Sequence, residues 1–319
     1  MQAAVLTEPR HFCLREVALP EPGSQQVCVR LQGCGVCASN LPPFEGKPWF
    51  SYPMPPGSPG HEGWGIVHSV GKEVRRVAPG DRVGLLSFRG FAQFDVADEN
   101  AVVKLPQSLD RDPFPAEPLG CGMNVFYRAK IDKGKIVAIV GIGFLGAVVL
   151  RLAASSGATV IAITRREDAL GLAKGVGAAE CIVMDDHAGV VEQVKQITDG
   201  RFCDIVIEAA GKPWPLDLAT EICAERGRLI IAGYHQDGPR QVNMQLWNWR
   251  GIDVVNGHER DPEIYLQGMR SAVEAIASGR LDPSALYTHR YPLEQIGDAF
   301  ETAIRRPPGF MKALVMFQR

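Results

Sequence analysis

The chain has 319 residues, enough for about two domains that each bury a core of their own. Its apolar fraction of 46% and charged fraction of 22% are typical of a soluble globular protein, and a formal charge of −2 gives no reason to expect nucleic acid or an anionic membrane as a partner. Neither a membrane-spanning run nor a signal peptide is visible, so we expect a cytoplasmic protein.

The first hundred residues are rich in glycine and proline and contain short strand-like runs. They predict a small, mostly antiparallel β-domain with long loops, in which the prolines at 42–43 and 53–59 lie in extended loops rather than helices. The predicted strands cover residues 27–32, 65–70, 81–86 and 92–96.

Two segments of this β-domain carry the ligand types of a tetrahedral zinc site. His61 and Glu62 lie side by side between glycines, and Cys37 lies upstream. A His-Glu pair alone is a weak motif, and an ordinary turn with a solvated pair is the alternative interpretation. Cys34 and Cys37 form a Cys-x-x-Cys with no second pair and no thioredoxin-like context, so only one of them needs a chemical role.

The pattern changes near Lys133, where apolar runs begin to alternate with helical segments. This alternation predicts a doubly wound parallel sheet. The predicted strands are 135–140, 159–163, 181–184, 204–208, 228–232 and 252–255. The predicted helices between them are a run from the glycine motif at 141–146 to residue 156, and residues 167–175, 190–197 and 216–224. Helices at 262–278 and 293–305 and a strand at 312–317 complete the chain.

A Gly-x-Gly-x-x-Gly motif follows the first of these strands and opens a helix, which is the context that dinucleotide binding requires. Gly141 would make the tight turn, Gly143 would let pyrophosphate approach, and Gly146 would let helix and strand pack closely. Phe144 and Leu145 lie between them, where free N–H groups at the helix start would face the phosphates. The alternative is a glycine-rich turn without a ligand.

The end of the next strand indicates which dinucleotide is bound. An acidic residue there would bind a ribose 2′-hydroxyl, but the chain has Thr164, Arg165 and Arg166. An arginine pair suits a 2′-phosphate, so we expect NADP, with NAD possible. The alternative is that both arginines are solvated residues at a helix start, partly neutralised by Glu167 and Asp168.

Taken together, these stretches resemble the zinc-type medium-chain dehydrogenases/reductases, the alcohol and polyol dehydrogenase family. The resemblance runs in family order across nearly the whole chain. It is carried by residues 35–39, 60–65 with Gly71, 80–83, 90–94, 117–119 and the glycine motif at 141–146.

The resemblance implies an α/β architecture in which a Rossmann domain, residues 122–257, is inserted into a GroES-like catalytic domain, residues 1–121 and 258–319. Zinc and the nicotinamide would meet in the cleft between the domains. The substrate would be a small-molecule alcohol or carbonyl compound. Relatives of this type usually form homodimers or homotetramers through the edge of the Rossmann sheet.

The resemblance also implies the site residues. Cys37 and His61 would be zinc ligands, Glu62 an outer or exchanging ligand, and a third ligand would lie near Glu117. Lys312 falls where the family often has a basic residue facing the cofactor pyrophosphate.

Two residues compete for the third position. Thiolate is the softer ligand, which favours Cys121. Glu117 is favoured by alignment without gaps on polyol-type relatives, in which a glutamate marks the third zinc position, and we therefore predict Glu117.

Three departures from the family pattern modify these expectations. Only residues 84–89 intervene where many relatives carry a four-cysteine lobe, so we expect one zinc ion. Asn40 replaces an aspartate that often supports the zinc histidine, which should weaken that support. Pro42 lies near the place of a relay histidine, so a proton leaving through Ser39 would finish in water or cofactor hydroxyls.

The expected activity is therefore that of an NADP-preferring, zinc-dependent alcohol or polyol dehydrogenase, with zinc as Lewis acid and Ser39 carrying the proton. Two alternatives stay open: an NADPH-dependent reductase of another carbonyl or an activated C=C bond, and a non-catalytic dinucleotide-binding protein. The substrate, the physiological direction and whether His258 contacts substrate are left open.

Overall fold

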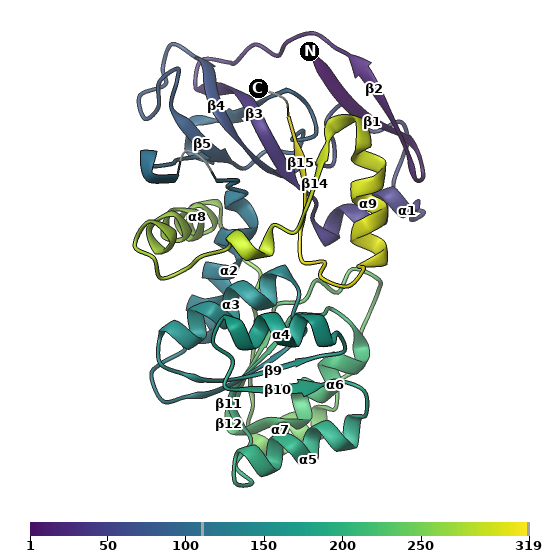
Figure 1. Cartoon of the computed structure of the whole chain (residues 1–319), viewed down its shortest axis with the longest axis vertical. Helices are drawn as coiled ribbons and strands as arrows, with labels where there is room; N and C mark the ends of the chain where they lie inside the picture. The colour runs from purple at the N-terminus through teal and green to yellow at the C-terminus, as the bar shows by residue number, and fades with distance from the viewer. Residues whose placement is uncertain (110–111, 318–319) are drawn as a thin grey trace. The chain divides into compact units, whose positions relative to one another are not determined.

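A computed structural model describes residues 1–109 and 112–317 of the protein. The backbone divides into two compact units, one formed by Met1–Gly120 with Met269–Arg319 and the other by Cys121–Gly268 (Figure 1). The chain passes from one unit to the other within α2 (Ala116–Ala129) and again within α8 (Pro262–Ala277).

The first unit is built on a mostly antiparallel sheet, in which one pair of strands is parallel. Its strands follow the order β14-β15-β3-β4-β5-β7, β6 pairs with β3 beside this path, and β1 and β2 form a separate hairpin. The bounds are β1 (Gln2–Glu8), β2 (His11–Glu16), β3 (Gln26–Gly35), β4 (Glu62–Val70), β5 (Arg82–Leu85), β6 (Phe94–Asp98), β7 (Val102–Lys104), β14 (His289–Pro292) and β15 (Ala313–Met316). The expected antiparallel β-domain is confirmed, and β15 joins it from the far end of the chain.

An aromatic cluster closes one side of this unit. The ring of Phe44, on α1 (Leu41–Glu45), lies 4.8 Å from that of Phe300 on α9 (Ile296–Arg305), and Phe12 lies 5.0 Å from Phe300. The expectation that the prolines at 42–43 exclude a helix was wrong. They occupy the first turn of α1, where a proline needs no hydrogen-bond donor of its own.

The second unit is a parallel sheet in the order β10-β9-β8-β11-β12-β13. Helices α3 and α4 cover one face and α5 to α7 the other, which confirms the doubly wound fold (Figure 1). The strands are β8 (Ile136–Val140), β9 (Thr159–Thr164), β10 (Glu180–Val183), β11 (Cys203–Glu208), β12 (Cys223–Ile231) and β13 (Asp253–Asn256). The helices are α3 (Phe144–Ser155), α4 (Glu167–Gly175), α5 (His187–Ile197), α6 (Pro213–Glu221) and α7 (Met244–Arg250).

Several predicted boundaries were wrong in this unit: the strand expected at 228–232 begins at Cys223, and the helix expected at 190–197 begins at His187. The helix expected at 216–224 begins earlier, at Pro213, and ends at Glu221, because β12 already begins at Cys223. Proline at the first helical position explains the early start, since its missing N–H would be unpaired there in any case. Parallel pairing of Cys203 with Cys223 then extends β12 backwards.

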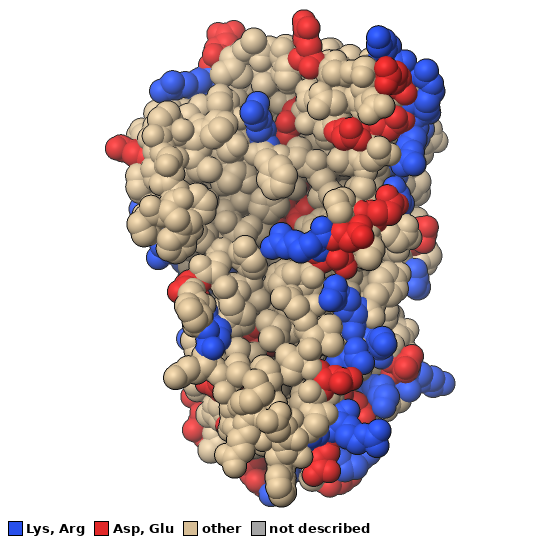
Figure 2. Space-filling view, turned by 180° about the vertical axis from the view of Figure 1, so that it is seen from behind, with Lys and Arg blue, Asp and Glu red and all other residues tan. Residues whose placement is uncertain are grey.

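The distribution of charged side chains on the surface agrees with the formal net charge of −2. On the face in Figure 2, basic and acidic side chains are interspersed, and neither sign forms a continuous field. Within the described residues, no helix has the length and apolar character needed to cross a membrane.

Candidate metal centre and dinucleotide site

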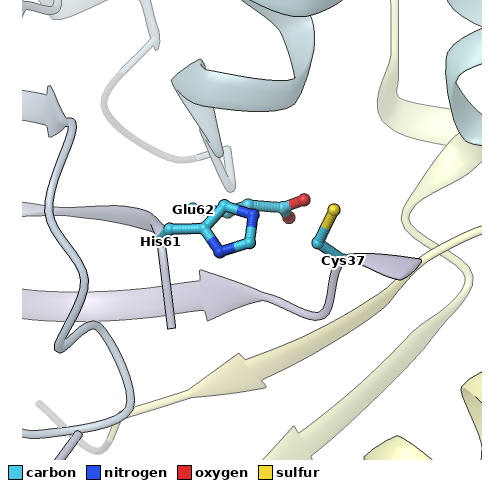
Figure 3. A group of neighbouring side chains, drawn as sticks. All are labelled: Cys37, His61 and Glu62. Carbon is cyan, nitrogen blue, oxygen red and sulfur yellow. The ribbon is translucent and has the colours of Figure 1, made fainter. Parts of the chain in front are cut away.

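Three predicted zinc ligands converge in the first unit. Cys37 follows β3, and His61 and Glu62 lie at the start of β4, which pairs antiparallel with β3. One ligand atom from each of the three lies within 4.8 Å of the others (Figure 3). Among the described residues this is the group of histidine, cysteine and acidic side chains that could hold a metal ion. Thiolate, imidazole and carboxylate are the donor set of zinc, so the residues fit the metal that the sequence predicted.

Gly35 is required for this convergence. It lies opposite Glu62 in the β3–β4 ladder, and a Cβ at this position would lie 1.8 Å from the Glu62 carboxylate. Any side chain would therefore displace the carboxylate from the group.

Asn40 ties the two segments together. It ends a short helical turn, η1 (Ala38–Asn40), and is buried. Its Oδ1 accepts from the Cys37 backbone N–H at 2.9 Å, and its Nδ2 donates to the Pro59 carbonyl at 2.9 Å. That same carbonyl lies 3.1 Å from Nδ1 of His61. The histidine is thus supported by a backbone carbonyl that Asn40 holds, although the expected aspartate is missing.

We expect Asn40→Ala to weaken zinc affinity by roughly 10–100-fold, the usual cost of losing a residue that orients metal ligands. Competition with a zinc chelator measures the change. Asn40→Asp keeps the acceptor for Cys37 and should lose less. Unchanged zinc affinity in Asn40→Ala would show that Asn40 does not orient the ligands.

Glu62 has a buried cationic partner that the sequence did not reveal. The Lys312 ammonium lies 2.6 Å from Oε1 and 2.5 Å from Oε2 of Glu62, and both side chains are almost completely buried. Burial alone would lower the pKa of Lys312, but the charge of Glu62, assisted by Cys37 and Glu117, raises it. The structure therefore pairs Lys312 with Glu62 beside the metal group, and its expected role toward the cofactor pyrophosphate stays a prediction.

Several acidic side chains surround the imidazole of His61. Burial would lower the pKa of His61, yet the hydrogen bond and charge of Cys37, with the charges of Glu117 and Glu62, raise it to about 10. The negative charge of these side chains favours binding of a cation at this position. Because metal binding needs a neutral imidazole and a thiolate, zinc uptake must release protons here.

The two candidates for the third ligand are engaged differently. Glu117 is buried on α2, and its charge acts on both His61 and Lys312. Cys121, one helical turn later, has its sulfur 3.1 Å from the Tyr265 hydroxyl. Glu117 is thus electrostatically coupled to the metal group, whereas the Cys121 sulfur contacts the Tyr265 hydroxyl on α8.

Ser39 lies at the edge of the metal group. Its hydroxyl oxygen is 3.4 Å from Nε2 of His61, and the residue is half-buried in η1. A hydroxyl in this place can both donate and accept a hydrogen bond, as proton transfer requires.

The glycine motif of the second unit has the geometry that phosphate binding needs. Gly141 adopts a φ of +105°, and a Cβ on Gly146 would lie 2.1 Å from the Gly141 carbonyl oxygen. Gly143 has open space where its Cβ would be. Phe144 and Leu145 form the first turn of α3, and the N-terminal end of a helix favours an anion.

The three residues from the end of β9 to the start of α4 differ in exposure and contacts. Thr164 is buried, and Arg166 donates to the Ile142 carbonyl at 3.1 Å and lies 3.5 Å from Asp168. Arg165 is exposed. Arg166 therefore braces the glycine loop, and Arg165 is the more exposed of the two arginines.

Two segments of the chain match domains of known proteins. Residues 23–107 match the alcohol dehydrogenase GroES-like domain, and residues 145–269 match the zinc-binding dehydrogenase domain. The chain is 32% identical to an alcohol dehydrogenase of Rhizobium meliloti over 268 residues, 73% of this chain and 77% of the relative. The chain belongs to the zinc-type medium-chain dehydrogenase family.

Other relatives of this dehydrogenase extend over almost its whole length. A sorbitol dehydrogenase of Bacillus subtilis is 27% identical over 347 residues, 99% of this chain and 97% of the relative. A zinc-binding dehydrogenase of Sinorhizobium meliloti, solved with NADP bound, superimposes with a TM-score of 0.85 at 25% identity and covers 99% of this chain and 98% of the other. The relatives support zinc and a nicotinamide cofactor for the dehydrogenase.

Proposed function

We propose that this dehydrogenase oxidises an alcohol or polyol, or reduces the matching carbonyl compound, with zinc and NADP(H). The observation that carries the proposal is the convergence of Cys37, His61 and Glu62 within 4.8 Å of one another. The named relatives are oxidoreductases that act on CH–OH groups, among them alcohol and sorbitol dehydrogenases.

Cys37 and His61 would hold the metal, with Glu62 beside them on its Lys312 partner. Glu117, buried on α2 and acting by its charge on His61, would be the third ligand. Zinc bound there supplies a Lewis acid that lowers the pKa of an alcohol hydroxyl. Ser39 would accept the hydroxyl proton and pass it to water or to cofactor hydroxyls. Asn40 keeps the Cys37 and His61 segments in register during this transfer.

The glycine motif would hold the cofactor pyrophosphate, and Thr164 and Arg165 would meet the adenosine ribose. Exposure of Arg165 and the NADP found in the Sinorhizobium meliloti structure support a preference for NADP over NAD. A homodimer or homotetramer stays a prediction.

We expect Arg165→Ala to weaken NADPH binding by ~1.5–3 kcal/mol, the cost of losing a charged hydrogen bond to the 2′-phosphate. NADH binding should hardly change, because NADH lacks that phosphate. Titration of both cofactors into parent and variant measures the difference. Equal affinity of the parent for NADPH and NADH would remove the argument for NADP.

A panel of alcohols, polyols and ketones, assayed with both cofactors, tests the proposed function. We expect turnover on at least one alcohol–carbonyl pair. Turnover only on compounds with an activated C=C bond would make the protein a reductase, and cofactor binding without any turnover would make it a binding protein.

A further inference from the structure

A chain of hydrogen bonds in the second unit leads from the core to the surface and is not part of either site described above. Glu208, the last residue of β11, is fully buried. One of its carboxylate oxygens lies 2.9 Å from Nε2 of His235, and Nδ1 of His235 accepts from Nε of Arg240 at 2.8 Å. We call these three residues the Glu208–His235–Arg240 relay.

The partners of His235 settle the position of its proton. Arginine can only donate, so Nδ1 of His235 must accept, and its proton lies on Nε2 and is donated to Glu208. The ring is therefore held in one tautomer and one orientation by a partner on each side.

The inner end of the relay holds the backbone next to the glycine motif. The second Glu208 carboxylate oxygen accepts from Ala210 N–H at 2.7 Å and from Gly211 N–H at 2.6 Å. A Cβ on Gly141 would lie 2.9 Å from the Ala210 nitrogen, so this loop packs directly against the first glycine of the motif. Through His235, the same carboxylate also reaches the loop that follows β12.

At the surface end of the relay, an ion pair also joins the loop after β11 to the loop after β12. Arg240 pairs with Asp237, and Lys212 lies 3.2 Å from the same carboxylate. The hydrogen bond from Arg240, followed by that from Lys212, lowers the pKa of Asp237 to about 2. Lys212 follows β11 and Asp237 follows β12, so both ends of the relay connect these loops.

The relay lies where the sheet order reverses. Strands β8 and β11 are neighbours, with Glu208 level with Val140, and ligands of doubly wound sheets bind beyond the carboxyl ends of strands at this point. The sheet has two mononucleotide-binding halves. The glycine motif and Arg165 belong to the β8–β9 half, so the loops after β11 and β12 serve the other half.

We propose that the Glu208–His235–Arg240 relay positions the loops after β11 and β12 for the nicotinamide half of the cofactor. His235 is the positioning residue at its centre. The inference rests on the nicotinamide dinucleotide proposed above. It assigns a function to a histidine that has no motif around it.

The test compares binding of the whole dinucleotide with binding of its adenosine half. The probes are whichever of NADPH and NADH the parent binds more tightly, and 2′,5′-ADP or ADP accordingly. We expect His235→Leu to weaken dinucleotide binding about tenfold or more, since two hydrogen bonds to charged groups are lost, while binding of the adenosine half changes less than about twofold. His235→Gln should restore affinity, because its amide can donate to Glu208 and accept from Arg240.

Two further variants make the test decisive. Arg240→Met removes the outer partner and should show the same selective loss, so it decides the question if His235→Leu does not fold. His187→Leu is the matched control, because His187 lies on α5 and contacts Trp214 and Glu221 instead. Equal weakening of both probes, or of neither, in His235→Leu and Arg240→Met overturns the relay. A parent protein that binds neither dinucleotide overturns the proposed function as well.

Discussion

Cys37→Ser is expected to lower turnover by about a thousandfold or more, the equivalent of several kcal/mol of Lewis-acid stabilisation. Cys37 supplies the thiolate of the metal group, and a serine hydroxyl does not replace a thiolate ligand at neutral pH. The melting temperature should change little, since Cys37 is half-buried and is not part of the apolar core of its unit. Zinc content and turnover, measured on the same preparation, test this expectation.

Cys34→Ala is the matched control. Cys34 is the other member of the Cys-x-x-Cys, but it is completely buried in β3 and packs in the apolar core of its unit. This variant should keep its zinc and its turnover. If Cys37→Ser instead yields insoluble protein, the metal group is structural rather than catalytic.

The second large effect is expected at Glu117. Glu117→Ala should lose zinc and most of its turnover, because the metal would be left with one thiolate and one imidazole from the proposed set. Cys121→Ala should keep both, since the Cys121 sulfur contacts the Tyr265 hydroxyl. Chelator resistance of the bound zinc and turnover in the two variants measure the difference.

The opposite pattern would reverse the assignment. Zinc lost from Cys121→Ala and retained by Glu117→Ala would make the thiolate the third ligand. The electrostatic coupling of Glu117 to His61 would then reflect proximity alone.

Local patterns predicted most of the fold, because each strand of the parallel sheet is an apolar run bounded by turn residues. Residues 135–140 and 204–208 coincide with β8 and β11 to within one residue. One exception is the pair of prolines at 42–43, which were expected in a loop but lie in the first turn of α1, where a missing N–H has no cost.

The candidate site was predicted as far as local motifs reach. Glycine-rich motifs in the sequence mark the positions of His61, Glu62 and Cys37. Lys312 lies 250 residues after Glu62 in the chain, and no local sequence pattern predicts that the two side chains pair. The same holds for the pair of His235 with Glu208, which joins the loop after β12 to the end of β11. Long-range pairing of this kind depends on the register of whole elements, which the sequence pattern alone does not determine.

Removal and restoration of zinc, followed by turnover of the best alcohol or polyol with NADP, tests the central claim most directly. We expect one zinc ion per chain, loss of turnover when a chelator removes it, and recovery when one equivalent is returned. Cofactor binding should survive the removal, because the glycine motif lies in the other unit of the chain. Full turnover in protein shown to be free of zinc would contradict the account.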